Sequence, residues 1–240
     1  MATRDAISNF FITLVALFFM VLLGMMLKAR YRLPSEVAAS APVPKAIPIA
    51  MATTPETANI PVARAYKSGE FWVLPNPELI VSRGNEPDTL RIKSGEKEDV
   101  FALYFIDAVE ASWTHPRRVN EQAAFFGHAP TQRVLEAGST ALAYVTQLLR
   151  THKFTVYTKW GRVPESERFY ALITVETTKG VNEEDLGELL VRKGYAMPVG
   201  QVTSSLPFAG RSVDAHLKIL RKAADQARAD HAGLWAHATQ

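Results

Sequence analysis

The chain has 240 residues, with 27 Lys and Arg against 24 Asp and Glu, a formal net charge of +3 and no cysteine. Because 48% of its residues are apolar, the composition excludes an intrinsically disordered chain. The lack of cysteine excludes a disulfide scaffold, a thiolate zinc site, an iron–sulfur cluster and a cysteine nucleophile.

An uncharged, strongly apolar run extends from Phe10 to Leu27. As a helix it would span about 27 Å, close to the hydrocarbon thickness of a bilayer. A cleavable signal peptide would be followed by small residues, but here Lys28, Arg30 and Arg32 follow. We therefore predict an uncleaved, single-pass membrane anchor over residues 1–32. By the positive-inside rule, the three flanking cations favour a cytoplasmic location for the rest of the chain.

Residues 33–66 contain six of the fourteen prolines and show neither a helical nor an alternating apolar pattern. Proline lacks a backbone donor and restricts φ, so this composition favours an extended tether. We expect one folded domain over residues 67–240.

The domain opens with β-like segments. Alternating and β-branched residues predict three strands, at Phe71–Ser82, Thr89–Lys93 and Val100–Ile106. The polar segment Ser94–Asp99 contains a glycine and predicts a hairpin between the second and third strands.

Helices and further strands follow in the sequence. A helix is predicted near Val119–Phe126, a longer one over the apolar-periodic run Val134–Leu149, and strands at Phe154–Lys159 and Phe169–Glu176. Asn182 is predicted to cap a helix that stops at Gly194, and the last helix covers Leu217–Ala227 and ends near Gly233-Leu234-Trp235. This order predicts an α+β domain in which helices pack outside a small β-barrel.

The six histidines show no paired ligand spacing within one predicted element, and common nucleotide-binding, serine-hydrolase and zinc-protease motifs are absent. We therefore predict that these histidines lie at the surface or are partly packed: His115, His128, His152, His216, His231 and His237.

Carboxylates flank the predicted hairpin. Asp88 precedes its first strand, Asp107 follows its second strand, and Glu110 comes three residues later. Because the two strands are antiparallel, these positions meet at one end of the hairpin. Such a group suits a hard divalent cation, although aspartate at a strand end is also common in turns.

Two segments, Glu86–Leu90 and Val100–Glu110, resemble the staphylococcal-nuclease-like (thermonuclease) family. That family carries D-G-D-T before a strand and then F-R-L-x-x-[VI]-D-[TA]-P-E. Later segments are similar in the same order: a strand beginning with the family's second active-site arginine, an N-E-x-L-V-x-x-G-x-A helix and a terminal G-[IL]-W. They are Arg168–Leu172, Leu186–Ala196 and Gly233-Leu234-Trp235.

The resemblance implies a five-stranded OB-type β-barrel with three helices, and calcium-dependent hydrolysis of phosphodiester bonds in DNA and RNA. It implies that Asp88 and Asp107 bind Ca²⁺ with their carboxylates and Ala108 with its carbonyl. Glu110 would position or activate the attacking water. Arg168 would contact the phosphate and stabilise the charge of the transition state.

The chain also departs from the family pattern. Ala102 stands where the family has its first catalytic arginine, and the loss of one charge donor typically costs about 10²–10³-fold in rate. A nuclease of reduced activity and an inactive module that binds protein or nucleic acid both remain open. Arg162 is an alternative to Arg168, though the strand after Arg168 fits better, and Arg91 is a hypothetical substitute for the missing guanidinium.

Residues 1–66 hold 6 cations and 3 anions, whereas residues 67–240 hold 21 of each. The net charge of +3 therefore belongs to the anchor and tether. The domain lacks the broad basic field of a non-specific nucleic-acid binder, which disfavours a nucleic-acid scaffold. Members of the family are often exported, whereas the flanking charges favour the cytoplasm, so the side of the membrane is left open.

Overall fold

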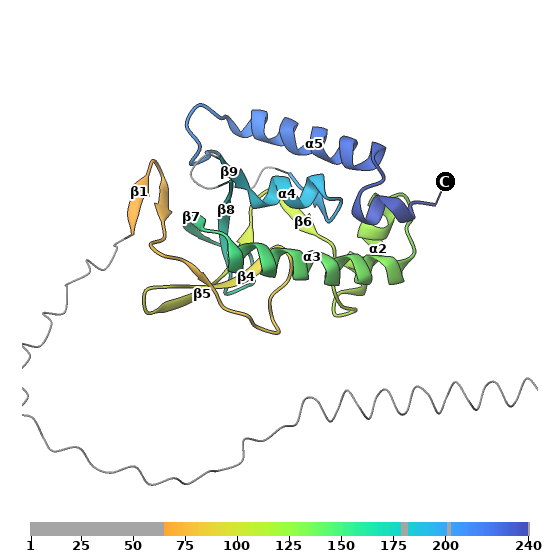
Figure 1. Cartoon of the computed structure of the whole chain (residues 1–240), viewed down its shortest axis with the longest axis horizontal. Helices are drawn as coiled ribbons and strands as arrows, with labels where there is room; N and C mark the ends of the chain where they lie inside the picture. Colours follow the sequence, from red (N-terminus) through yellow and green to blue (C-terminus); the bar gives the residue numbers. More distant parts are fainter. Residues whose placement is uncertain (1–64, 179–181, 201–202, 240) are drawn as a thin grey trace, which may run out of the picture. The chain divides into compact units, whose positions relative to one another are not determined.

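The computed structural model describes residues 65–178, 182–200 and 203–239. These residues are drawn as a coloured ribbon in Figure 1. The predicted anchor, residues 1–32, and all but the last two residues of the predicted tether, residues 33–66, lie outside the described residues. Over the described ranges, no helix has both the length and the apolar character needed to cross a bilayer.

A mixed sheet of eight strands forms the centre of the domain, in the order β1-β2-β7-β8-β5-β4-β3, with β9 paired to β8. A second, two-stranded ladder joins β6 and β10. Strands β5 and β8 pair in parallel, and the other pairs are antiparallel. The strands are β1 (Tyr66–Ser68), β2 (Phe71–Val73), β3 (Glu78–Leu79), β4 (Thr89–Ser94), β5 (Lys97–Leu103), β6 (Ile106–Ala108), β7 (Phe154–Arg162), β8 (Phe169–Thr178), β9 (Asn182–Asp185) and β10 (Ala196–Pro198).

Helices pack beside the strands, and Figure 1 shows α4 lying along α5. The described helices are α2 (Pro116–Phe125), α3 (Thr131–Thr151), α4 (Leu186–Arg192) and α5 (Val213–Ala229), with a final 3₁₀ turn η1 (Gly233–His237). The long helix α3 buries Val134, Ala141 and Val145 along one face, because residues spaced three, four or seven apart lie on the same side of a helix. The predicted helices and the strands near Phe154 and Phe169 are confirmed within a few residues of their expected ends.

The predicted α+β class is confirmed, but the predicted barrel closure is not. Among the described residues the strand pairing is an open path, in which β1 and β3 occupy the two ends and do not pair with each other. Both end strands are short, and β6 leaves the main sheet to pair with β10. Within the described residues the sheet therefore has no ladder that would close it into a barrel.

Two predicted strands are interrupted in the structure. The segment Val100–Ile106 breaks at Phe105, whose φ of 68° is incompatible with an extended strand, so β5 ends and β6 begins there. The segment Phe71–Ser82 splits into β2 and β3 because Pro75 and Pro77 cannot donate to a ladder.

The predicted helix cap at Asn182 is wrong. Residues Asn182–Asp185 pair with β8 as strand β9, and the cap of α4 is Asp185. The Oδ1 atom of Asp185 accepts a hydrogen bond from the backbone N–H of Glu188 at 2.8 Å. Of the acidic residues before the helix, Asp185, next to the apolar Leu186, provides the cap.

Candidate active site

Asp88 and Ala108 connect the start of β4 to the end of β6. The Oδ2 atom of Asp88 accepts a hydrogen bond from the N–H of Ala108 at 2.7 Å, and Oδ1 accepts one from the hydroxyl of Thr89 at 3.1 Å. Burial raises the pKa of Asp88 to about 6, although the bond from Ala108 opposes this shift. Asp107 directly precedes Ala108 in the chain, so the bond to Ala108 brings Asp88 close to Asp107. The sequence analysis expected these two carboxylates to meet.

Glu110 lies two residues after the end of β6 and is 3% exposed. Its backbone N–H donates to Oε1 of Gln122 at 2.8 Å, which fixes the chain at this point. Burial raises the pKa of the Glu110 carboxyl to about 7, while the nearby charge of Arg118 opposes the shift. Two neighbouring carboxyls with raised pKa values are typical of catalytic and binding sites.

Helix α2 adds two side chains that the sequence did not single out. Arg118 makes a hydrogen bond through Nη2 to Oδ1 of Asp107, and its Nε lies 3.0 Å from Oε1 of Glu110. Gln122 donates through Nε2 to the carbonyl of Ala108 at 2.8 Å and to Oδ2 of Asp107 at 3.3 Å. Burial would lower the pKa of Arg118, but the surrounding carboxylates outweigh it and raise that pKa.

A sequence signal for these two residues exists, but it is weak. Arg118 and Gln122 are four positions apart and so share one face of the helix. The prediction began this helix at Val119, one residue too late to include Arg118. Gln122 is fully buried, and nothing in the sequence distinguishes it from an exposed glutamine.

Arg168 reaches the site through a hydroxyl. Its Nη1 donates to Oγ1 of Thr89 at 3.3 Å, and that hydroxyl donates to Asp88. A second bond, from Nε to the hydroxyl of Ser166 at 2.9 Å, orients the guanidinium. Arg162 instead pairs with the exposed Glu167, away from this group. Of the two arginines, Arg168 is therefore the one that lies at the site.

Ala102 lies on β5, opposite Thr89 of β4 and beside Tyr170 of β8. Its methyl group leaves the site without a guanidinium at this position. In the described part of the chain, the side chain of Arg91 makes no ion pair with the site carboxylates, so it does not replace the missing group. The guanidinium that contacts these carboxylates comes from Arg118.

The predicted calcium ligands are oxygen atoms, which is the chemistry that Ca²⁺ requires. All three residues are already engaged in the structure. Asp88 accepts from the N–H of Ala108 and the hydroxyl of Thr89, Asp107 accepts from Arg118 and Gln122, and the carbonyl of Ala108 accepts from Gln122. The chemical type of these donor atoms therefore suits a calcium ion. The guanidinium of Arg118 is the group that a cation would have to displace from Asp107.

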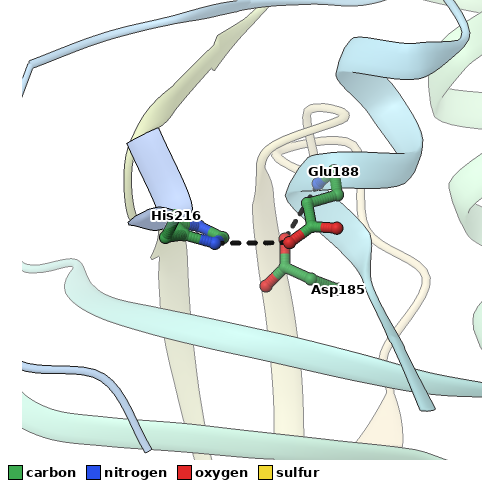
Figure 2. Close-up of side chains that lie close together, drawn as sticks. All are labelled: Asp185, Glu188 and His216. Carbon is green, nitrogen blue, oxygen red and sulfur yellow. Dashed lines mark hydrogen bonds and ion pairs between the residues drawn. The ribbon is translucent and has the colours of Figure 1, made fainter. Parts of the chain in front are cut away.

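Asp185, Glu188 and His216 form a second buried cluster, shown in Figure 2. Within the described residues, this is the group of carboxylate and imidazole ligand atoms that all lie within 4.8 Å of one another, and it could hold a metal ion. His216 is 1% exposed, so the prediction of a surface or partly packed histidine is wrong for this residue. Its spacing from Leu217 and Leu220 on the apolar face of α5 could have indicated burial.

A cavity of about 1070 Å³ is lined by residues that neighbour the first group of carboxylates in sequence, but not by Asp88, Asp107 or Glu110 themselves. Glu86 and Ala111, which neighbour the site residues in sequence, contribute to its lining, and the opposite wall is part of α3. Arg83 and Arg150 place two cations on it. The cavity is thus large enough for a small anionic ligand and provides charges that would attract one.

Neither models of known protein families nor curated protein sequences match this chain.

Proposed function

We propose that this chain is a membrane-anchored, staphylococcal-nuclease-like hydrolase that cleaves phosphodiester bonds of nucleic acid with Ca²⁺. The observation that carries the proposal is the convergence of Asp88, Asp107, Glu110 and Arg168, which come from separate segments of the chain. The α+β order of strands and helices is compatible with that family, although the strand pairing of the described residues is open and forms no closed barrel.

Each residue of the site has a role that follows from its contacts. Glu110, buried beside Asp107, accepts the proton of the attacking water. Arg168, held by Thr89 and Ser166, neutralises the charge that develops on the phosphate oxygens. A calcium ion held by Asp88, Asp107 and the Ala108 carbonyl would supply further positive charge to the phosphate.

Arg118 compensates in part for Ala102. In the absence of a cation it is the counter-ion of Asp107 and Glu110. Its side chain is 33% exposed, so the guanidinium has room to turn from the carboxylates to a phosphate. Two guanidinium groups then face the substrate, Arg118 from α2 and Arg168 from β8.

A second candidate function is an inactive module that binds another protein. Two observations favour it: Ala102 lacks the guanidinium of the family, and Arg118 already neutralises two carboxylates. The zero net charge of residues 67–240 favours a protein partner over nucleic acid for this alternative.

The membrane anchor at residues 1–32 and the tether at residues 33–66 are part of the same proposal. They would hold the hydrolase within reach of a membrane surface, on a side that the sequence leaves open. Protease accessibility of the domain in intact cells, compared with lysed cells, assigns that side.

Hydrolysis of single-stranded DNA and RNA by the full chain in detergent tests the proposal, with Ca²⁺ or with EDTA. We expect cleavage with Ca²⁺, loss of cleavage in EDTA, and a loss of about 10²-fold or more in Glu110→Gln. Glu98→Gln, an exposed carboxylate on β5, is the matched control and should retain activity. Cleavage that survives both EDTA and Glu110→Gln would contradict the assignment.

Ala102→Arg separates the two candidate functions. If Arg118 serves as the second guanidinium, adding Ala102→Arg to an Arg118→Gln variant should restore its rate of hydrolysis. In the wild-type background, Ala102→Arg should then change that rate by less than about tenfold. If the site is inactive for want of an arginine, Ala102→Arg alone should create activity where the wild type shows none.

A further inference from the structure

We propose that Asp185, Glu188 and His216 bind a zinc-like dication that links α4 to α5, with Arg211 as the counter-ion that the metal displaces. This site shares no residue with the carboxylates of the proposed hydrolase, and its binding of a metal does not require that reaction. It is a structural site with its own ligands and its own counter-ion.

The three ligands come from two helices that pack together. Asp185 caps α4, Glu188 lies in its first turn, and His216 lies in the first turn of α5. Figure 2 shows the three side chains turned toward one another, with Nδ1 of His216 3.3 Å from Oε1 of Glu188. A metal bound here would therefore connect the starts of both helices.

One carboxylate oxygen of this cluster is buried without a hydrogen-bond partner among the described residues. Asp185 is 6% exposed, and its Oδ1 atom is used to cap the helix. Its Oδ2 atom is buried and has no hydrogen-bond partner among the residues that the structure describes. A buried carboxylate oxygen without a partner is costly, and coordination to a cation would remove that cost.

The mixture of donor atoms selects the type of metal. One imidazole nitrogen and two carboxylate oxygens suit Zn²⁺ and similar first-row dications, which take nitrogen and oxygen together. Calcium and magnesium prefer sites built from oxygen alone. We therefore expect this site to discriminate against Ca²⁺, the cation proposed for Asp88 and Asp107.

Arg211 occupies the position of a competing cation. Its guanidinium makes an ion pair with Oε1 of Glu188 and lies 3.5 Å from Nδ1 of His216. The side chain of Arg211 is 34% exposed and stacks on Phe208, so it has a path to solvent. When a metal binds, this guanidinium leaves Glu188, and the two positive charges of the metal neutralise the carboxylates of Asp185 and Glu188.

Access for a metal and its bound water is provided by a cavity of about 400 Å³. Asp185, Glu188 and Arg211 all contribute to its lining. His216 is not part of this lining and packs its ring edge-on to Phe105, with 5.1 Å between the ring centroids. A cation held by three protein ligands could complete a tetrahedral shell with water from this cavity.

Zinc titration of the untagged full chain, against a chromophoric chelator and by thermal denaturation, tests the proposal. We expect one Zn²⁺ per chain and a rise in Tm, with no comparable competition from Ca²⁺. Arg211→Gln should bind zinc at least about tenfold more tightly than the wild type, because its competing charge is gone.

Two variants should weaken zinc binding. Asp185→Asn keeps the helix cap, because asparagine caps as well as aspartate, but it removes the free anionic oxygen. His216→Gln removes the nitrogen ligand. The controls are His231→Gln, an exposed histidine, and Asp107→Asn, a residue of the other site, and both should bind zinc as the wild type does.

Equal zinc affinity in the wild type, Asp185→Asn and His216→Gln would overturn the site. Failure of Arg211→Gln to bind zinc at all would do the same. Neither result depends on hydrolysis, so a failure of the proposed function leaves this test intact.

Discussion

The backbone of α3 at Gly138 packs directly against the backbone of Glu110, with no side chain between them. A Cβ atom on Gly138 would lie 2.2 Å from the carbonyl oxygen of Glu110 and 2.6 Å from the nitrogen of Ala111. Both are backbone atoms, which cannot move aside as a flexible side chain can. The small residue in α3 therefore sets the position of the candidate catalytic carboxylate.

Gly138→Ala should destabilise the domain by about 1–3 kcal/mol, because overpacking against the backbone exceeds the gain in helix propensity. It should also displace Glu110 and reduce hydrolysis more than it reduces substrate binding. Urea denaturation gives the first effect and the separation of kcat from KM gives the second. Gly200→Ala is the control, since no atom of the described residues lies within 4 Å of its Cβ position. Equal free energies of unfolding for the two variants would show that the backbone at Glu110 shifts to accommodate the added methyl group.

Gln122→Met should cost about 2–4 kcal/mol of unfolding free energy, since the similar shape leaves the N–H of Glu110 and the carbonyl of Ala108 unpaired. Chemical denaturation measures the loss. Gln132→Met, on the exposed part of α3, should change stability by less than about 0.5 kcal/mol. A loss no larger than that of the control would mean that water or a shifted backbone replaces both bonds.

Arg118→Gln should destabilise the calcium-free domain by about 1–2 kcal/mol, less than the loss from a fully buried pair, because its side chain is 33% exposed. The same change frees Asp107, so added Ca²⁺ should raise the Tm of this variant more than that of the wild type. Arg117→Gln, whose ion pair with Glu121 is exposed, should show neither effect. Equal calcium shifts in all three proteins would argue against Asp107 as a calcium ligand.

The stability of the calcium-free domain should fall as the pH rises from about 4 to about 7. Burial raises the pKa of Glu110 to about 7 and that of Asp88 to about 6, so the folded state binds more protons than the unfolded state across this window. The contribution of these two groups to the free energy of unfolding is fully present below their pKa values in the unfolded state. It is lost as the pH rises through their pKa values in the folded state.

Glu110→Gln should flatten this pH dependence, and Glu98→Gln should leave it unchanged. Thermal denaturation in EDTA at several pH values between 4 and 8 gives both slopes. A wild-type stability that rises across this range would mean that paired carboxylates elsewhere dominate the titration.

Much of the secondary structure was predictable because it depends on local pattern. Helical spacing located α3 and α5, and β-branched runs located β7 and β8. The strand ends at Phe105 and between β2 and β3 were missed. A positive φ at a phenylalanine is imposed by packing, and the chain pattern around it remains that of a strand.

For the candidate site, the sequence alone indicated Asp88, Asp107 and Glu110, because residues at the ends of a hairpin must meet. Only the tertiary structure showed that Arg118 and Gln122 contact this group. No local spacing in the sequence predicts how α2 packs against the strands. The same holds for His216, which reaches Asp185 and Glu188 through the contact of two helices. Local patterns determine which element a residue belongs to, whereas the partners of buried charges are chosen by how the elements pack.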